Sequence, residues 1–489
     1  MIAYLSTSKL LFKEFNQNKI TYCHWKSNEH LVPGLNGDTD LDVLVNSEDK
    51  NKTTKILEKI HFVRCISQFG SRYKGVEDWI SVDEETGKMI HLHLHYRMIT
   101  GHKGMKEYEL PWTKLALKTK ILDSNTNVYI TEPNLEIVVL ITRIGLKVSR
   151  KELKKAKKDK YKFKDDNKEE IKYLNKRIDL KIVKEILSNY YNNDESEYII
   201  NLIKKETITS KEIIKLYKIT KNVFLPKNII IRLDNLLKQY YYSFMIKLSN
   251  FMKNKFLWNT ITRKKISEKG KMIVFIGQDG SGKSTVSKEI YKWLDWKIEA
   301  KRFYLGSGEF YNSKYKKISK RIGNTKNSFL KIIKGYCIIK DYVYLSKHTY
   351  RTLKKAKKYT EKGGIAIFDR FPQIQYFGIN DGPKLKEFYL PKVKQNILRK
   401  IVIRNSKVEE KYLKKACSIN PNVVIKLIIS PEESLKRKPE ENYEIVKRKH
   451  EIIKEMKFEN SNVYNIDASQ DYNDELIEVK NIIWKNIKK

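Results

Sequence analysis

The chain has 489 residues, enough for two or three domains that each bury a hydrophobic core. Hydrophobic residues make up 40% of it and aromatic residues 11%, so the composition excludes a disordered protein although 32% of the residues are charged. The formal net charge of +41 attracts polyanions such as nucleotides, nucleic acids and anionic lipid headgroups, but it does not select among them. Part of this excess has a compositional explanation, because an AT-rich genome also enriches a protein in lysine, isoleucine and asparagine.

The sequence pattern predicts neither a membrane-spanning helix nor a secretory signal. No run of 18 apolar residues occurs, and the best candidate, residues 137–146, is interrupted by Arg143, so we expect no membrane-spanning helix. The N-terminus lacks a basic region followed by an apolar segment, which argues against a secretory signal. The four cysteines form no CxxC pair, which fits a reducing compartment and no cysteine zinc site. We expect a cytoplasmic protein, with peripheral association with a membrane left open.

Residues 1–145 mix strand and helix patterns and contain seven of the nine histidines. Twelve residues after Tyr22–Ser27 comes Asp40-Leu41-Asp42, followed by an apolar run. Carboxylates two residues apart on a strand face the same side and can hold Mg²⁺ ions against a triphosphate. Asp40 and Asp42 are therefore the predicted metal ligands of this region. The alternative is that they are structural carboxylates that cap the turn at residues 36–38.

This arrangement resembles the nucleotidyltransferase superfamily, in which a Gly-Ser turn and a helix precede an Asp-x-Asp strand. The resemblance covers roughly the first 120 residues and implies an α+β nucleotidyltransferase-like domain at residues 1–145. Two positions depart from the family pattern: Lys26 replaces the turn glycine, and His93 or His95 stands where a third carboxylate is expected. The resemblance thus implies either a nucleotidyltransferase or its inactive, substrate-binding descendant.

Three histidines alternate along a predicted strand at residues 89–97, namely His91, His93 and His95. Alternation places them on one face of the strand. They could form a hydrogen-bonded polar face, bind a transition metal or contact a substrate, and the sequence leaves these alternatives open.

Residues 146–268 are rich in lysine and mostly helical in pattern, with ten basic residues between positions 147 and 164. We interpret this segment as a basic helical connector whose charges are solvated. The alternative is contact with a polyanion or with an anionic membrane surface. An aromatic-rich stretch at residues 236–258 predicts a packing helix, or alternatively a helix that lies in a membrane surface.

From residue 269 onward strand and helix patterns alternate, which predicts an α/β domain with a doubly wound parallel sheet at residues 269–489. The apolar run 272–276 predicts a buried strand. It leads into GQDGSGKST at residues 277–285, which fits the pattern G-x-x-x-x-G-K-[ST]. Glycines at these positions let backbone N–H groups approach phosphate oxygens. Apolar spacing from Val286 onward predicts a helix whose N-terminus faces the phosphates.

This loop predicts a site for ATP with Mg²⁺. Lys283 is expected to contact the β- and γ-phosphates, and the Ser284 hydroxyl is expected to bind Mg²⁺. The predicted nucleotide-binding residues of the loop are Gly277, Asp279, Gly280, Ser281, Gly282, Lys283, Ser284 and Thr285.

The loop resembles that of thymidylate kinases and their relatives among the P-loop nucleotide kinases. Further motifs follow in the family's order, at residues 364–372 (ending in Asp-Arg-Phe-Pro), 421–432, 434–438 and 464–470. The likeness covers about 220 residues. It implies a kinase in which Lys283, Asp369, Arg370 and Arg437 are catalytic.

The resemblance also implies individual roles. Asp369 would hold Mg²⁺ through water or orient the acceptor, and Arg370 would bind the acceptor phosphate. Because the loop has no arginine of its own, Lys436, Arg437 or Arg448 in the lid would cover the transferring phosphoryl group. A homodimer is a further expectation from the resemblance.

The acceptor pocket departs from the thymidylate kinase pattern at residues 303–310 and 373–383. We therefore expect the acceptor to be another nucleotide or a small phosphorylated metabolite, with Arg351 as an additional candidate contact. Two alternatives remain: an enzyme that processes nucleic-acid ends, and a nucleotide-switched scaffold docked on a membrane.

Overall fold

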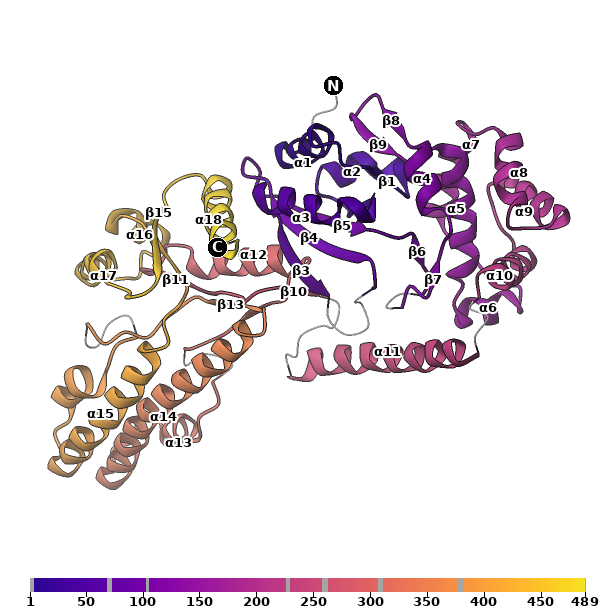
Figure 1. Ribbon diagram of the computed structural model, residues 1–489. Helices are drawn as coiled ribbons and strands as arrows, with labels where there is room; N and C mark the ends of the chain where they lie inside the picture. Colours follow the sequence, from indigo (N-terminus) through magenta and orange to yellow (C-terminus); the bar gives the residue numbers. More distant parts are fainter. Residues whose placement is uncertain are drawn as a thin grey trace. The chain divides into compact units, whose positions relative to one another are not determined.

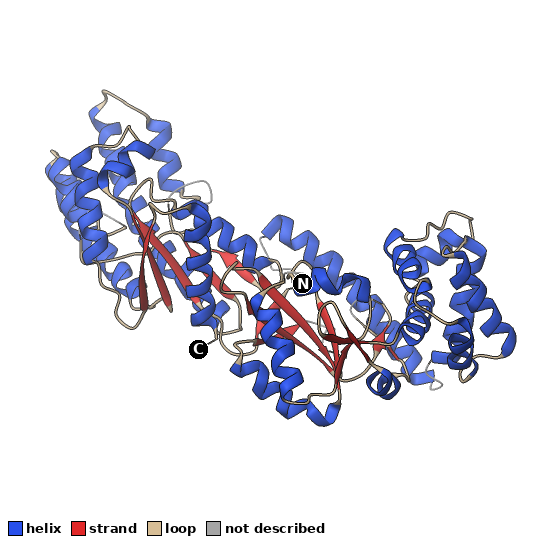
Figure 2. Ribbon diagram, turned by 90° about the horizontal axis from the view of Figure 1, so that it is seen from above, coloured by secondary structure: helices blue, strands red, loops and turns tan. Residues whose placement is uncertain are grey.

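The computed structural model describes residues 4–67, 73–102, 105–225, 229–256, 263–306, 311–376 and 381–488. The chain divides into two compact units, Met1–Lys264 and Lys265–Lys489 (Figures 1 and 2). Each unit is described by itself. The helices that the sequence set apart as a basic connector belong to the first unit.

The first unit is built on a mixed sheet. Its strands follow the order β3-β4-β5-β2-β1-β9-β8, in which β2 runs parallel to β5 and antiparallel to β1. The strands are β1 (Tyr22–His24), β2 (Leu41–Val45), β3 (Val63–Ser67), β4 (Val76–Val82), β5 (Met89–His95), β8 (Ile121–Asp123) and β9 (Val128–Ile130), and a separate pair is formed by β6 (Ile99–Thr100) and β7 (Tyr108–Glu109).

The alternation in β5 decides which side chains enter the core of this sheet. Ile90, Leu92 and Leu94 are fully buried and share a core cluster with side chains of α1 and α3. The intervening histidines therefore occupy the opposite face of the strand. The shorter helices of this part of the unit are α1 (Ser6–Gln17), α2 (Leu31–Leu35), α3 (Lys50–Lys59) and α4 (Thr113–Thr119).

A helical layer completes the first unit. Helix α5 (Pro133–Leu146) is the apolar segment that the sequence analysis considered as a spanning candidate, and it is buried along almost its whole length. Capping boxes begin three helices of this layer, at Ser149, Asn192 and Thr209, because each is followed by a glutamate three residues later. The helices are α6 (Arg150–Ala156), α7 (Asp165–Asn175), α8 (Leu180–Ser188), α9 (Asn193–Lys205) and α10 (Ser210–Phe224).

Helix α11 (Ile229–Phe256) differs from the expected packing helix. Tyr242 is buried, but several large apolar side chains along the helix are exposed. Leu237, Tyr240 and Phe244 each have at least six-tenths of their surface exposed. Residues 257 and 258 of the predicted segment lie outside the described residues. No helix in the described part of the chain is both long and apolar enough to cross a membrane.

The second unit contains a parallel sheet, as the sequence predicted. Among its described residues, five strands follow the order β12-β13-β11-β14-β15, and every neighbouring pair is parallel. The strands are β11 (Met272–Gly277), β12 (Ala300–Arg302), β13 (Ile365–Phe368), β14 (Val423–Ile428) and β15 (Asn462–Asp467). The chain starts at the central strand β11, moves to one side and returns to the other. Sheets of this kind bind ligands at the carboxyl ends of the strands where the order reverses, here between β11 and β13.

Helices cover both faces of this sheet. Val274 of β11 shares a core cluster with side chains of α14 and α17. Ile273 and Phe275 are also fully buried and point to the opposite face, where α12 and α18 pack. The helices are α12 (Lys283–Asp295), α13 (Lys314–Ile322), α14 (Ser328–Thr360), α15 (Asn396–Cys417), α16 (Pro431–Arg437), α17 (Tyr443–Glu455) and α18 (Tyr472–Ile487).

Candidate functional site

The loop between β11 and α12 has the backbone that a phosphate-binding loop needs. Gly280 and Gly282 have φ values of +83° and +82°, which residues other than glycine rarely adopt. Gly282 is the N-cap residue of α12. A Cβ added at Gly277 would lie 2.3 Å from Ser281 Oγ and 2.7 Å from Leu427 O. The glycines therefore keep the loop tight, and its backbone leads into the N-terminus of α12, where N–H groups favour an anion.

Lys283 lies inside this loop. Its Nζ donates a hydrogen bond of 2.6 Å to the carbonyl oxygen of Gln278, five residues earlier. Burial lowers the pKa of Lys283 to about 8, so the ammonium group is charged at neutral pH. An ammonium group folded back over a glycine-rich loop can neutralise phosphate charge there.

Ser284 and Asp369 come together from neighbouring strand ends. Ser284 Oγ, at the start of α12, lies 3.5 Å from Asp369 Oδ2, which directly follows β13. A hydroxyl and a carboxylate are ligands that Mg²⁺ accepts. Arg302, which was not among the predicted site residues, also lies here: its Nη2 is 3.6 Å from Asp369 Oδ2 and 3.3 Å from Ser287 Oγ. The signal was present, because Arg302 ends β12, the neighbour of β13, at the same edge of the sheet.

Of the three expected lid residues, only Arg437 contacts the loop among the described residues. Arg437 donates to the carbonyl oxygens of Gly280 (3.4 Å) and Ala468 (3.1 Å). Lys436 is exposed and pairs with Glu433 on its own helix, at 3.4 Å.

Arg448 is also exposed, on α17, whereas its neighbour Lys449 lies 2.5 Å from Asp279 Oδ2. Helical spacing could have identified Lys449, since it shares a face with the buried Val446 and Ile452. Burial alone would raise the pKa of Asp279, but the hydrogen bond and charge of Lys449 outweigh it and lower this pKa.

A pocket of about 70 Å³ lies beside Arg370, between α14 and α15. Arg370 Nη1 lies 3.7 Å from Asp381 Oδ1, and burial raises the pKa of Asp381. Glu409, a buried residue of α15, shapes the wall by accepting hydrogen bonds from the backbone N–H groups of Lys384 and Leu385 at 3.2 and 2.9 Å. Other lining residues include Tyr342, Ser346 and Thr349.

Arg351, the additional acceptor contact that the sequence suggested, is not part of this pocket. It is exposed on α14. Residues 307–310 and 377–380, within the two segments that depart from the thymidylate kinase pattern, lie outside the described residues.

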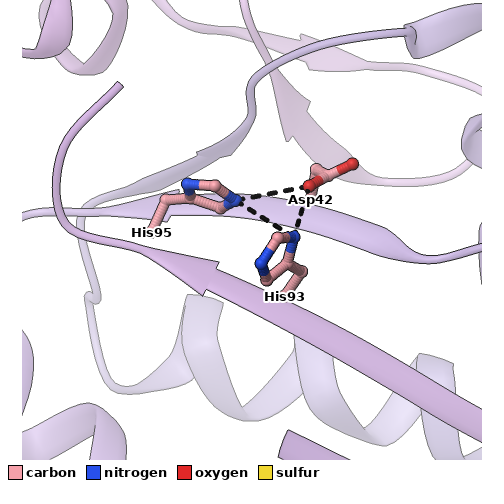
Figure 3. Close-up of side chains that lie close together, drawn as sticks. All are labelled: Asp42, His93 and His95. Carbon is pink, nitrogen blue, oxygen red and sulfur yellow. Dashed lines mark hydrogen bonds and ion pairs between the residues drawn. The ribbon is translucent and has the colours of Figure 1, made fainter. Parts of the chain in front are cut away.

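The first unit contains a separate polar cluster around Asp42 (Figure 3). Asp42 Oδ1 lies 2.8 Å from Lys26 Nζ, 3.0 Å from His93 Nδ1 and 3.3 Å from His95 Nε2. Burial alone would raise the pKa of Asp42, but Lys26 and the two histidines hold it well below its usual range. Lys26, which replaces the expected turn glycine, therefore places a cation directly on the predicted metal ligand.

Asp40 contacts a different histidine. Its Oδ1 lies 2.8 Å from His91 Nδ1, and the other ring nitrogen of His91 lies 3.0 Å from Asp78 Oδ1. Asp40 and Asp42 thus face the histidine strand separately, each opposite a different histidine. A second acidic cluster, formed by Glu29, Glu136 and Glu170, lies close to Arg143.

The comparisons with known proteins are distant. No protein-family model matches this chain. The chain is similar to the uncharacterized ATP-binding protein YghR of Escherichia coli strain K12, with 23% identity over 226 residues that cover 43% of this chain and 86% of the relative. Among solved structures, it is similar to deoxyadenosine kinase from M. mycoides with bound dATP (19% identity, 43% of this chain and 97% of that chain, TM-score 0.28).

A second solved structure, that of APE1195, is similar at 17% identity over 45% of this chain and 98% of that chain, with a TM-score of 0.23. At such scores the fold of the second unit is assigned from its own strand order and loop geometry. The second unit is a mixed α/β unit with a parallel sheet and a tight glycine loop at the sheet's central strand.

Proposed function

We propose that the second unit is an ATP-dependent kinase that transfers the γ-phosphate to a nucleotide or a small phosphorylated metabolite. The observation that carries this proposal is the meeting of Lys283, Ser284 and Asp369 around a glycine loop where the strand order reverses. Phosphoryl transfer depends on charge stabilisation and alignment more than on covalent catalysis, and this set supplies both. The similarity to YghR, an ATP-binding protein, supports ATP as the nucleotide that this unit binds.

Each residue has a task in this mechanism. Bound ATP would supply the phosphoryl group, and Mg²⁺ would neutralise phosphate charge. The loop backbone holds the phosphates, and Lys283 neutralises their charge. Ser284 and Asp369 would hold the metal ion, with Arg302 orienting the Asp369 carboxylate.

Arg370 would bind the acceptor. Its guanidinium is half-exposed, and its acidic partner Asp381 lies in the same pocket at 3.7 Å. A phosphate on the acceptor would compete with Asp381 for this guanidinium, which supports an anionic acceptor. Arg437 and Lys449 would close the loop from the lid side, because both already contact loop atoms.

The test uses the purified protein with Mg²⁺ and ATP labelled separately at the α and γ positions. Nucleoside monophosphates and sugar phosphates serve as acceptors. We expect label to move from the γ position only, and we expect Lys283→Ala to abolish this transfer because the phosphates lose their counter-charge.

Lys288→Ala provides the matched control, since Lys288 is an exposed lysine on the same helix. Undiminished transfer by Lys283→Ala would contradict the kinase proposal. Transfer of the α label would instead point to nucleotidyl transfer by the first unit. An oligonucleotide acceptor, with binding that weakens steeply with salt, would favour nucleic-acid end processing.

Two expectations about partners stay predictions. The first is contact of the basic helices with a polyanion or an anionic membrane, and the second is assembly into a homodimer. The exposed apolar side chains of α11 support a contact surface on that helix, and sedimentation with anionic vesicles, with and without ATP, tests a membrane as its partner.

A further inference from the structure

Three atoms of the first unit that could each ligate a metal ion lie in one small triangle, formed by Asp42 Oδ1, His93 Nδ1 and His95 Nε2 (Figure 3). The carboxylate oxygen lies 3.0 Å from the first nitrogen and 3.3 Å from the second, and the two nitrogens are 3.3 Å apart. A tetrahedral ion with bonds of about 2.0–2.1 Å separates its ligands by about 3.3 Å. The triangle therefore already has the edge lengths of a tetrahedral site.

The sheet positions these atoms. Asp42 of β2 lies opposite His93 of the parallel strand β5, and His95 follows two residues later on the same face. The side chain of His95 is fully buried, while those of Asp42 and His93 are about one-sixth exposed. Of the two ring nitrogens of His95, Nδ1 has no hydrogen-bond partner among the described residues, so the polar contacts of the ring are made through Nε2 in the triangle.

The donor types favour one class of ion. Two imidazoles and one carboxylate suit zinc and its transition-metal neighbours, whereas Mg²⁺ selects oxygen ligands. Asp40, the other carboxylate expected to hold Mg²⁺, is instead bonded to His91 at 2.8 Å. The set thus departs from the paired-carboxylate magnesium site that the resemblance to nucleotidyltransferases implies.

We propose that Asp42, His93 and His95 bind a transition-metal dication of the zinc class, which leaves a fourth coordination position for water or an anionic ligand. This inference is independent of the proposed kinase activity. On binding, His93 Nδ1 and His95 Nε2 present lone pairs to the ion, and any proton that they carry moves to the other ring nitrogen or to solvent. With the proton on Nε2, His93 has the Asp78 carboxylate 3.9 Å away as an electrostatic partner, too far for a direct hydrogen bond, and Lys106 gives up its contact with that nitrogen.

Lys26 is the competing cation, because its Nζ lies 2.8 Å from the proposed ligand oxygen. Metal binding displaces this ammonium group from Asp42 Oδ1. Lys26→Met keeps most of the length of the side chain and removes its charge, so it should raise the affinity for Zn²⁺ about tenfold. A purely structural role of the Lys26–Asp42 pair would give no gain in affinity.

The experiment uses the full chain without a polyhistidine tag, stripped with a chelator and titrated with Zn²⁺ against a chromophoric chelator. We expect one equivalent of Zn²⁺ to bind, and binding to weaken at least 100-fold in Asp42→Asn and His95→Ala. His30→Ala is the matched control, because His30 is a half-exposed histidine of the same unit. Unchanged stoichiometry and affinity in Asp42→Asn and His95→Ala would overturn the proposal.

Titration of the unmodified protein with Co²⁺ keeps the proposal falsifiable if these variants fail to fold, as checked by circular dichroism. We expect the intense visible absorption of tetrahedral Co²⁺, together with a rise in the midpoint of thermal unfolding on adding Zn²⁺ but not Mg²⁺. The weak spectrum of octahedral aqueous Co²⁺, or an equal rise with Mg²⁺, would overturn it.

Discussion

Replacing Glu409 by alanine should loosen the wall of the candidate acceptor pocket. The buried carboxylate accepts hydrogen bonds from the backbone N–H groups of Lys384 (3.2 Å) and Leu385 (2.9 Å), and Leu385 is itself fully buried. Leaving a buried donor unsatisfied costs about 1–3 kcal/mol. The free energy of local opening at Leu385 should therefore fall by about that amount, which corresponds to amide hydrogen exchange roughly 5–150 times faster.

Hydrogen exchange followed by mass spectrometry measures this change without knowledge of the acceptor. Peptides that cover residues 381–390 should exchange faster in Glu409→Ala, while peptides of the loop 277–285 should not change. Glu409→Gln should show a smaller effect, because the amide keeps one carbonyl acceptor. Glu410→Ala is the matched control on the same helix. Unchanged exchange at Leu385 in a folded Glu409→Ala variant would refute the reasoning.

Three further predictions concern the phosphate-binding loop. Gly277→Ala should weaken ATP binding at least tenfold in equilibrium titrations, because the new Cβ would lie 2.3 Å from Ser281 Oγ; wild-type affinity would contradict the tight loop. Lys449→Ala should weaken ATP binding severalfold and Arg448→Ala should leave it unchanged, since only the former side chain contacts the loop; the reverse order would contradict the lid geometry. The affinity of the free protein for ATP should be constant below pH 8 and fall above it, because Lys283 has a pKa of about 8 and loses its charge as the pH rises. Lys283→Arg should remove this fall, because arginine stays charged. A constant affinity of the wild type across pH 8 would contradict this role of Lys283.

Several features of the second unit were predictable because they are encoded locally. A buried apolar strand, a glycine loop and an amphipathic helix follow one another within residues 272–295, and each depends on neighbouring residues alone. Asp369 was predictable for a related reason, since a polar residue after a buried parallel strand reaches the carboxyl edge of the sheet. Arg302 could have been found by the same rule.

Other features depend on contacts between distant segments. Lys449 reaches Asp279 across 170 residues of chain, and Glu409 orders a turn 24 residues earlier. Side-chain type says little about such partners, because lysines and glutamates are abundant and most are solvated. The assignment of residues 146–264 to the first unit likewise follows from packing, in which side chains of α7–α10 share a core cluster with Trp25.

The sequence by itself determined that Asp40 and Asp42 point to one side of their strand, and that the three histidines point to one side of a second strand. Both follow from the two-residue period of a strand. Only the tertiary structure decided that Asp42 meets His93 and His95 while Asp40 meets His91. The reason is the register between β2 and β5, which the local sequence does not specify. A shift of one residue would turn one strand's polar side chains to the opposite face and dissolve the triangle.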